Sequence, residues 1–242
     1  MRIAVVMPAY NEAEGIVEFL QELNAALLPW QPTFFVVDDA SRDATAEAAR
    51  SAALADPPVP VSVQSNPANR GHGPSTLTAL GLGLASGADA VIAIDGDGQF
   101  TGPDVARLVQ TLLEGDAQIA EGVRTGRGDA LYRRATSQAT RALVWTRCRA
   151  WPADANTPLR AYRPEALRSL LEQVPADAMT PNLIISALCR RRGMRIVEVP
   201  VASRPRRGST AHGSTWGSRR ASLPSKRFIA FCGKAARQWV RT

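Results

Sequence analysis

The 242-residue sequence lacks an apolar run long enough to cross a membrane, and it contains only three cysteines and two histidines. A spanning helix takes about 20 predominantly apolar residues, so we expect no transmembrane helix. Cys148, Cys189 and Cys232 are widely spaced and odd in number, which excludes a disulfide framework and a zinc site. The apolar start, Met1–Pro8, is too short for a signal peptide, and we therefore expect a cytosolic protein.

Two nucleotide-binding signatures are also missing. No Gly-x-Gly-x-x-Gly follows the first apolar run and no Gly-x-x-x-x-Gly-Lys occurs, which argues against dinucleotide-dependent dehydrogenases and P-loop NTPases. No serine elbow has a plausible histidine partner. We interpret His72 and His212 as solvated loop residues, although His212 lies beside an arginine cluster and could contact an anion.

The charge, in contrast, is strongly positive and unevenly distributed. The net charge is +7, the pI is about 10.1, and all but two of the 29 basic residues are arginine. These residues dominate from Arg124 onward, which indicates an anionic partner such as a nucleic acid, a membrane surface or a phosphorylated substrate. The acidic clusters Asp38-Asp39 and Asp95–Asp97 oppose the nucleic-acid interpretation.

Short apolar segments alternate with helical patterns over the first 120 or so residues. This alternation predicts an α/β fold with a doubly wound, mostly parallel sheet, in which ligands bind at the carboxyl ends of the strands. Polar groups follow several of the predicted strands, so we expect them to meet at one edge. The predicted strands are Ile3–Met7, Thr33–Val37, Val59–Val63, Ala90–Ile94 and Ala117–Ala120.

The fourth of these strands leads into the most informative motif, Asp95-Gly96-Asp97-Gly98-Gln99. Alternation along an extended chain places Asp95 and Asp97 on one side. Their oxygen ligands suit a hard divalent cation, which in turn can hold a diphosphate. The alternative is a solvated acidic turn.

Beyond Glu121 the pattern is looser. We expect a flexible basic loop over Gly122–Asp129, a helix over Leu131–Ala150 and a mobile stretch over Arg204–Ser214. In the tail, from about Ser225 to Arg241, apolar and basic residues separate on a helical projection. Such a helix either lies in a membrane interface or packs on the domain, and both alternatives stay open.

Four ordered motifs resemble those of family 2 glycosyltransferases with the GT-A fold: Pro8–Glu12, Val36–Ser41, Asn69–Gly71 and Asp95–Gln99. Looser similarity continues through Gly122–Arg124, Asp154–Arg160 and Val197–Val201 to Arg207-Gly208-Ser209. These later stretches are similar to polyprenyl-phosphate sugar transferases of the dolichyl-phosphate mannosyltransferase kind. The motif Asp154–Arg160 departs from the usual pattern by ending Thr-Pro-Leu-Arg.

The resemblance implies roles for individual residues. The implied nucleotide-sugar-binding residues are Pro8, Ala9, Tyr10, Glu12, Asp39, Arg70, Gly71, Asp95, Gly96 and Asp97. The implied ligands of Mg²⁺ or Mn²⁺ are Asp95, Asp97 and Gln99. The implied contacts to an acceptor phosphate are Arg124, Arg133 or Arg134, and Ser137. The implied catalytic residues are Asp95, Asp97, Arg124 and Arg207, with Arg207 and Ser209 in a mobile loop that closes over the donor.

The resemblance also implies an inverting, metal-dependent hexose transfer from a nucleotide-diphosphate sugar to a polyprenyl phosphate at the cytoplasmic membrane face. A saccharide acceptor needs a general base, and Met179–Asn182 offers no acid, although Asp177 is near. Saccharide, protein and small-molecule acceptors remain the alternative. We expect a catalytic domain over 1–217, with a nucleotide-sugar half (1–121) and an acceptor half (122–217), and a basic amphipathic helix over 218–242. The oligomeric state is open.

Overall fold

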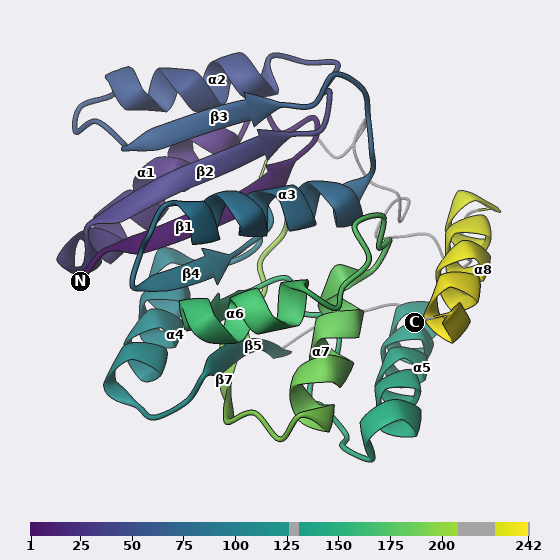
Figure 1. The fold of residues 1–242 in the computed structure, drawn as a ribbon. Coiled ribbons are helices and arrows are strands. Elements are labelled where there is room, and N and C mark those ends of the chain that lie inside the picture. The colour runs from purple at the N-terminus through teal and green to yellow at the C-terminus, as the bar shows by residue number, and fades with distance from the viewer. Residues whose placement is uncertain (126–130, 208–225, 242) are drawn as a thin grey trace.

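A computed structural model describes residues 1–125, 131–207 and 226–241, with side chains left out at 131–134, 226–229, 240 and 241. Within these residues, seven strands form one sheet in the order β3-β2-β1-β4-β6-β5-β7 (Figure 1). All neighbours are parallel except β6, which is antiparallel to β4 and β5. The strands are β1 (Ile3–Ala9), β2 (Pro32–Asp38), β3 (Val61–Ser65), β4 (Ala90–Ala93), β5 (Ile119–Thr125), β6 (Arg160–Tyr162) and β7 (Ile196–Ala202).

Helices cover both faces of this sheet, as the alternation of segments predicts. They are α1 (Ile16–Leu27), α2 (Thr45–Ser51), α3 (His72–Ala85), α4 (Gly102–Glu114), α5 (Leu131–Cys148), α6 (Pro164–Leu171), α7 (Pro181–Arg191) and α8 (Lys226–Arg241). Two 3₁₀ turns cover Leu28–Trp30 and Ala52–Leu54. No helix in the described part of the chain is long and apolar enough to cross a membrane.

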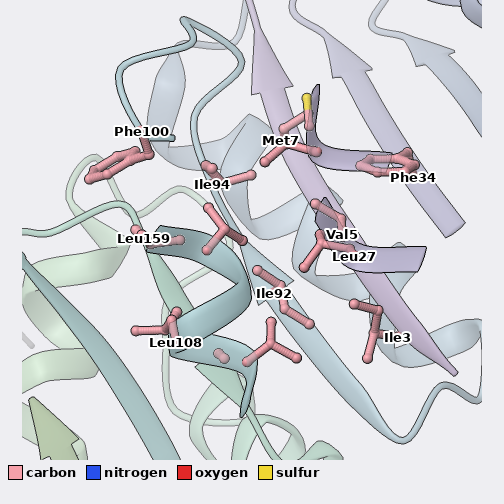
Figure 2. Close-up of a cluster of buried hydrophobic side chains, with 14 of the residues drawn as sticks. Ile3, Val5, Met7, Leu27, Phe34, Ile92, Ile94, Phe100, Leu108 and Leu159 are labelled. Atoms are coloured by element: carbon pink, nitrogen blue, oxygen red, sulfur yellow. The ribbon is translucent and has the colours of Figure 1, made fainter. Parts of the chain in front are cut away.

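Strand β1 shows how the sequence builds two cores. Ile3, Val5 and Met7 point to one face, where they pack with α1 and α4 (Figure 2). Ala4 and Val6 point to the other, where α3, α5, α6 and α7 lie. Both faces of a central parallel strand are buried, so the strand reads as a continuous apolar run. The predicted doubly wound α/β fold is confirmed.

Three predicted boundaries were wrong. Strand β3 begins two residues later than expected, because Val59 is buried and its amide bonds to Ala52 O at 3.1 Å. Helix α3 begins at His72, three residues before Ser75, where the run of small residues predicts its start. The predicted loop at Gly122 is instead part of β5, which continues to Thr125 because it pairs with β7 along its whole length. Arg124 therefore stands on a strand, with only 126–129 of that loop outside the described residues.

The tail helix α8 has the expected amphipathic pattern where its side chains are described. Trp239 is buried beside Ile184 and Ala187, whereas Lys234 and Arg237 are exposed. The Gln238 side chain accepts a hydrogen bond from Met179 N at 2.7 Å. The carboxyl-terminal end of α8 thus packs on the domain, as one of the two alternatives predicts.

Candidate active site

The acidic turn predicted at the end of β4 folds tightly against β1. A Cβ at Gly96 would lie 3.2 Å from Pro8 O and 3.3 Å from Ala9 Cβ, so glycine permits the close approach. Gly98 has φ +68°, a left-handed conformation that favours glycine. The Asp97 side chain accepts a hydrogen bond from Gln99 N at 3.1 Å. The two glycines therefore fix how Asp95, Asp97 and Gln99 are presented.

Glu12, which follows β1, joins Asp95 and Asp97 in one acidic cluster. Burial raises the pKa of Glu12 to about 7, and the charges of Asp97 and Asp95 add to the shift, whereas Arg206 opposes it. Burial, and then the charge of Asp95, raises the pKa of Asp97 to about 6. Desolvated carboxylates that repel one another mark a site that favours a cation.

A cation from the chain itself lies in this cluster. The Arg206 guanidinium pairs with both carboxylate oxygens of Glu12, with Nε 3.2 Å from Oε2. Arg206 lies within a short backbone pairing with the acidic turn, in which Arg204 N donates to Gln99 O and Arg207 N donates to Asp97 O. Residues 204–207 of the stretch that the sequence predicts to be mobile therefore bond to the acidic turn in this structure. Residues 208–214 lie outside the described part.

Arg207, the predicted catalytic arginine of this segment, has a different set of partners. Its guanidinium pairs with Glu18 and Glu22 on α1, and its aliphatic stem lies over Gly98. Arg204 also pairs with Glu22, at 2.7 Å. Burial works to raise the pKa of Glu22, but hydrogen bonds from Arg204 and Gly102 outweigh it and hold that pKa below its usual value. Arg207 thus anchors the segment to α1, and Arg206 is the arginine that reaches the acidic cluster.

Two further polar residues shape the rim of the site. The buried carboxylate of Asp39 accepts hydrogen bonds from the amides of Arg70 and Gly71, both at 2.8 Å, so it fixes the loop before α3. His72, at the start of α3, has Nε2 3.6 Å from Asp95 Oδ1. The sequence interpretation of His72 as a solvated loop residue missed this contact, although its place directly after Asn69–Gly71 was available as an indication.

The other predicted donor-side residues lie around the same strand ends. Pro8 and Ala9 are buried in β1, Tyr10 is half-buried, and Arg70 is exposed. Gly71 has φ +89°. The structure thus brings the predicted donor-side set together at one edge of the sheet.

The predicted acceptor-side residues fall on β5 and α5. Arg124 donates two hydrogen bonds to the Asp154 carboxylate, at 2.7 and 3.0 Å. Ser137 is half-buried in α5. Arg133 and Arg134 belong to the first turn of α5, where side chains are not described, and Ser209 and His212 lie outside the described residues. Of this set, the structure places Arg124 and Ser137 only.

The oxygen atoms at the turn could supply some of the ligands of a divalent cation. Among the described residues, no three His, Cys, Asp or Glu side chains gather closely enough to form a metal site on their own. Two carboxylates and the Gln99 amide oxygen are hard oxygen ligands, and Mg²⁺ commonly takes its remaining ligands from substrate phosphates and water. The raised pKa of Asp97 shows that its ionised carboxylate is unfavourable in this place, and a bound cation would offset that cost.

The raised pKa values predict how stability depends on pH without metal. Asp97 and Glu12 keep their protons to higher pH in the folded protein than in the unfolded chain, whose ordinary values are 3.8 and 4.5. Their protonated forms stabilise the fold at low pH, and this contribution is lost as pH rises through about 6 and 7. We expect the free energy of unfolding to fall by about 3 kcal/mol between pH 5 and pH 8 in urea titrations with EDTA.

The variant Asp97→Asn/Glu12→Gln is the control for this titration. It should show a clearly smaller fall over the same range, because both groups that titrate there are gone. An equal fall in the variant and the parent would assign the pH dependence to other residues.

A mostly parallel sheet that carries an Asp-Gly-Asp turn at its strand ends defines the GT-A class of glycosyltransferase folds. Solved structures agree: a mannosyltransferase from Pyrobaculum calidifontis, in complex with GDP-Man and Mn²⁺, matches with a TM-score of 0.63 at 22% identity, covering 98% of this chain and 64% of that one. The chain belongs to glycosyl transferase family 2, whose model matches residues 4–183. The family resemblance predicted from the four strand-end motifs is confirmed.

Three further proteins are similar to this chain in structure or in sequence. A glucosyl-3-phosphoglycerate synthase from Mycobacterium tuberculosis, in complex with Mn²⁺, UDP and phosphoglyceric acid, has a TM-score of 0.64 at 21% identity, over 99% of this chain and 76% of that one. An undecaprenyl-phosphate mannosyltransferase from Micrococcus luteus is 29% identical over 83% of both chains. An undecaprenyl-phosphate 4-deoxy-4-formamido-L-arabinose transferase from Klebsiella pneumoniae is 29% identical over 83% of this chain but 59% of its own length.

Proposed function

We propose that this chain transfers a hexose from a nucleotide-diphosphate sugar to a polyprenyl phosphate. The observation that carries the proposal is the partly buried acidic cluster at the ends of β1 and β4, with Arg206 against it. The names of relatives from Klebsiella and Micrococcus, both undecaprenyl-phosphate sugar transferases, support the acceptor class.

On the donor side, Asp95, Asp97 and Gln99 would hold Mg²⁺ or Mn²⁺. Such an ion, when bound, stabilises the charge of the leaving diphosphate. Both solved neighbours contain Mn²⁺, which supports a divalent cation at this place. Arg206 is already placed beside the carboxylates, so a diphosphate that enters the site meets a guanidinium without a large rearrangement of the chain.

On the acceptor side, a phosphate oxygen attacks the anomeric carbon as the bond to the diphosphate breaks, and the configuration inverts. A phosphate is already an anion and needs no general base. The start of α7 agrees with this, because it carries Pro181 and Asn182 where an acid would serve a hydroxyl acceptor, and the nearby Asp177 is exposed. Arg124, whose guanidinium is held by Asp154, would bind the acceptor phosphate together with Ser137 and an arginine of the first turn of α5.

Different parts of the chain bind the two substrates. Residues 1–121 bind the nucleotide sugar, residues 122–217 bind the acceptor, and residues 218–242 form a basic amphipathic extension. We place the reaction at the cytoplasmic face of the membrane, with the protein attached peripherally.

A transfer assay with radiolabelled donors tests the proposal. Purified protein is incubated with Mn²⁺, undecaprenyl phosphate in detergent, and GDP-mannose, UDP-glucose or UDP-N-acetylglucosamine in turn. We expect label to enter the organic phase with one donor, to disappear on adding EDTA, and to return with excess Mn²⁺. NMR of the product should show the inverted anomer.

A second set of reactions replaces the lipid by free saccharides or by glycerol phosphate. Product formed with these acceptors and never with undecaprenyl phosphate would overturn the acceptor assignment. Transfer that persists unchanged in EDTA would overturn the metal assignment.

A further inference from the structure

Alternating tryptophan and arginine side chains form a row along the carboxyl-terminal end of α5. The Arg149 guanidinium lies 4.6 Å from the ring centroid of Trp145, and that of Arg141 lies 5.1 Å from the ring centroid of Trp151. Arg141 and Trp145 are four residues apart on α5 and so share one helix face. The order in space is therefore Trp151, Arg141, Trp145 and Arg149, which we call the Trp–Arg row.

The tryptophans of this row are exposed, although α5 packs against the core of the domain. Trp145 and Trp151 are 40% and 49% exposed, and they are two of the few large apolar side chains at the described surface. On the opposite side of α5, Val144 is fully buried and Leu143 packs against the same core as α7. Trp145 on this packed helix and Trp151 just beyond its end are both held at the surface, which indicates a partner that covers them.

The charge around the row limits the choice of partner. Residues 130–153 contain five arginines and no acidic residue, so the partner is anionic. Single-stranded nucleic acid binds through bases stacked on free aromatic faces. Here a guanidinium already lies over a face of each ring. A stacked pair of this kind presents an apolar ring edge beside a cation, which suits the headgroup region of an anionic bilayer.

We propose that the Trp–Arg row docks the protein on a bilayer that contains anionic phospholipid. Trp145 and Trp151 would enter the interface, and Arg141 and Arg149 would bind lipid phosphates. The row is joined to the candidate acceptor site, because Trp151 lies three residues before Asp154, which holds Arg124. A bilayer bound here would present a lipid phosphate close to Arg124; this last link rests on the proposed function.

Flotation with vesicles tests the proposal on the full chain. We compare the parent protein, Trp145→Ser/Trp151→Ser and Arg141→Gln/Arg149→Gln on two kinds of vesicle. One is phosphatidylcholine alone, and the other contains roughly 30% phosphatidylglycerol, an anionic lipid that gives the surface a negative potential. We expect both double variants to bind the anionic vesicles about tenfold more weakly than the parent. Leu54→Ser, which removes an 89% exposed apolar side chain next to α2, is the matched control and should bind like the parent.

Thermal stabilisation by the nucleotide sugar and Mn²⁺ is measured on the same proteins. We expect the same stabilisation in all of them, since no residue of the row lies in the acidic cluster. Vesicle binding that is unchanged in both double variants would overturn the proposal and would assign binding to α8 or another surface. Equal binding to vesicles with and without phosphatidylglycerol would also overturn it. If nucleotide sugar and Mn²⁺ failed to raise the melting temperature of the parent while vesicle binding was intact, that result would count against the proposed function alone.

Discussion

Asp97→Asn is expected to lower kcat/KM for glycosyl transfer by about a thousandfold and, at the same time, to stabilise the metal-free fold. The substitution keeps the shape of the side chain and removes the charge that would hold the cation on the diphosphate. Groups that stabilise charge in the transition state are typically worth about a hundred- to a thousandfold each. Binding of Mn²⁺, measured by calorimetry in the presence of nucleotide, should weaken in parallel.

The gain in stability follows from the pKa of Asp97. Burial and the charge of Asp95 raise this pKa from 3.8 to about 6, so the ionised form at pH 7.5 costs the fold free energy. Removing that charge should raise the free energy of unfolding in EDTA by on the order of 2 kcal/mol. Loss of activity together with a gain in stability is typical of a residue retained for function rather than for folding.

Asp116→Asn is the matched control, because the same substitution is made at a side chain that is 90% exposed, beside Arg195. It should leave activity and metal binding within about twofold of the parent, as expected of a surface position. If Asp97→Asn retained parental activity and metal affinity, the motif would be a solvated acidic turn and the donor site would have to be sought elsewhere.

That the candidate donor-side residues meet at one edge of the sheet was predictable, because each of them is local to a strand end. Asp95 and Asp97 follow an apolar run, and strand ends of a parallel sheet meet at one edge, so pattern and topology suffice. Arg206 could not be identified in this way. Its partner Glu12 is 194 residues away, and which arginine of Arg204–Arg207 reaches the cluster depends on the backbone pairing with the turn.

The course of β5, which carries Arg124, was harder to predict because a buried charged residue lies within the strand. The predicted fifth strand stops at Ala120, directly before Glu121, because an isolated glutamate has low strand propensity and its burial is costly. In the structure Glu121 is 1% exposed and lies directly across from Arg160 of β6, so the charge is paired inside the sheet. Such a pair depends on strand order, which the local pattern does not contain.

Glu121→Gln is expected to lower the free energy of unfolding by about 3 to 5 kcal/mol, which is a large share of the total for a domain of this size. Among the described residues, Glu121 is the only carboxylate that pairs with Arg160, whose side chain is fully buried, at 3.3 Å. Burial alone would lower the pKa of Arg160, but Glu121 outweighs it and holds that pKa above its ordinary value. Neutralising Glu121 leaves a buried guanidinium without a counter-charge, and urea unfolding measures the cost.

Glu198→Gln is the matched control because Glu198 shares a partner with Glu121: the Arg190 guanidinium also lies 2.6 Å from the Glu121 carboxylate. Glu198 pairs with Arg190 at 3.1 Å, but its side chain is 38% exposed, so water compensates for the lost charge and the expected cost is below about 1 kcal/mol. Glu121→Leu/Arg160→Met should recover part of the stability that Glu121→Gln loses, because it removes the buried charge of Arg160. The recovery is partial because Arg190, which lies 2.6 Å from Glu121, then keeps Glu198 as its carboxylate partner. Equal destabilisation by Glu121→Gln and Glu198→Gln would contradict the argument, since it would mean that burial of the pair does not set its energetic effect.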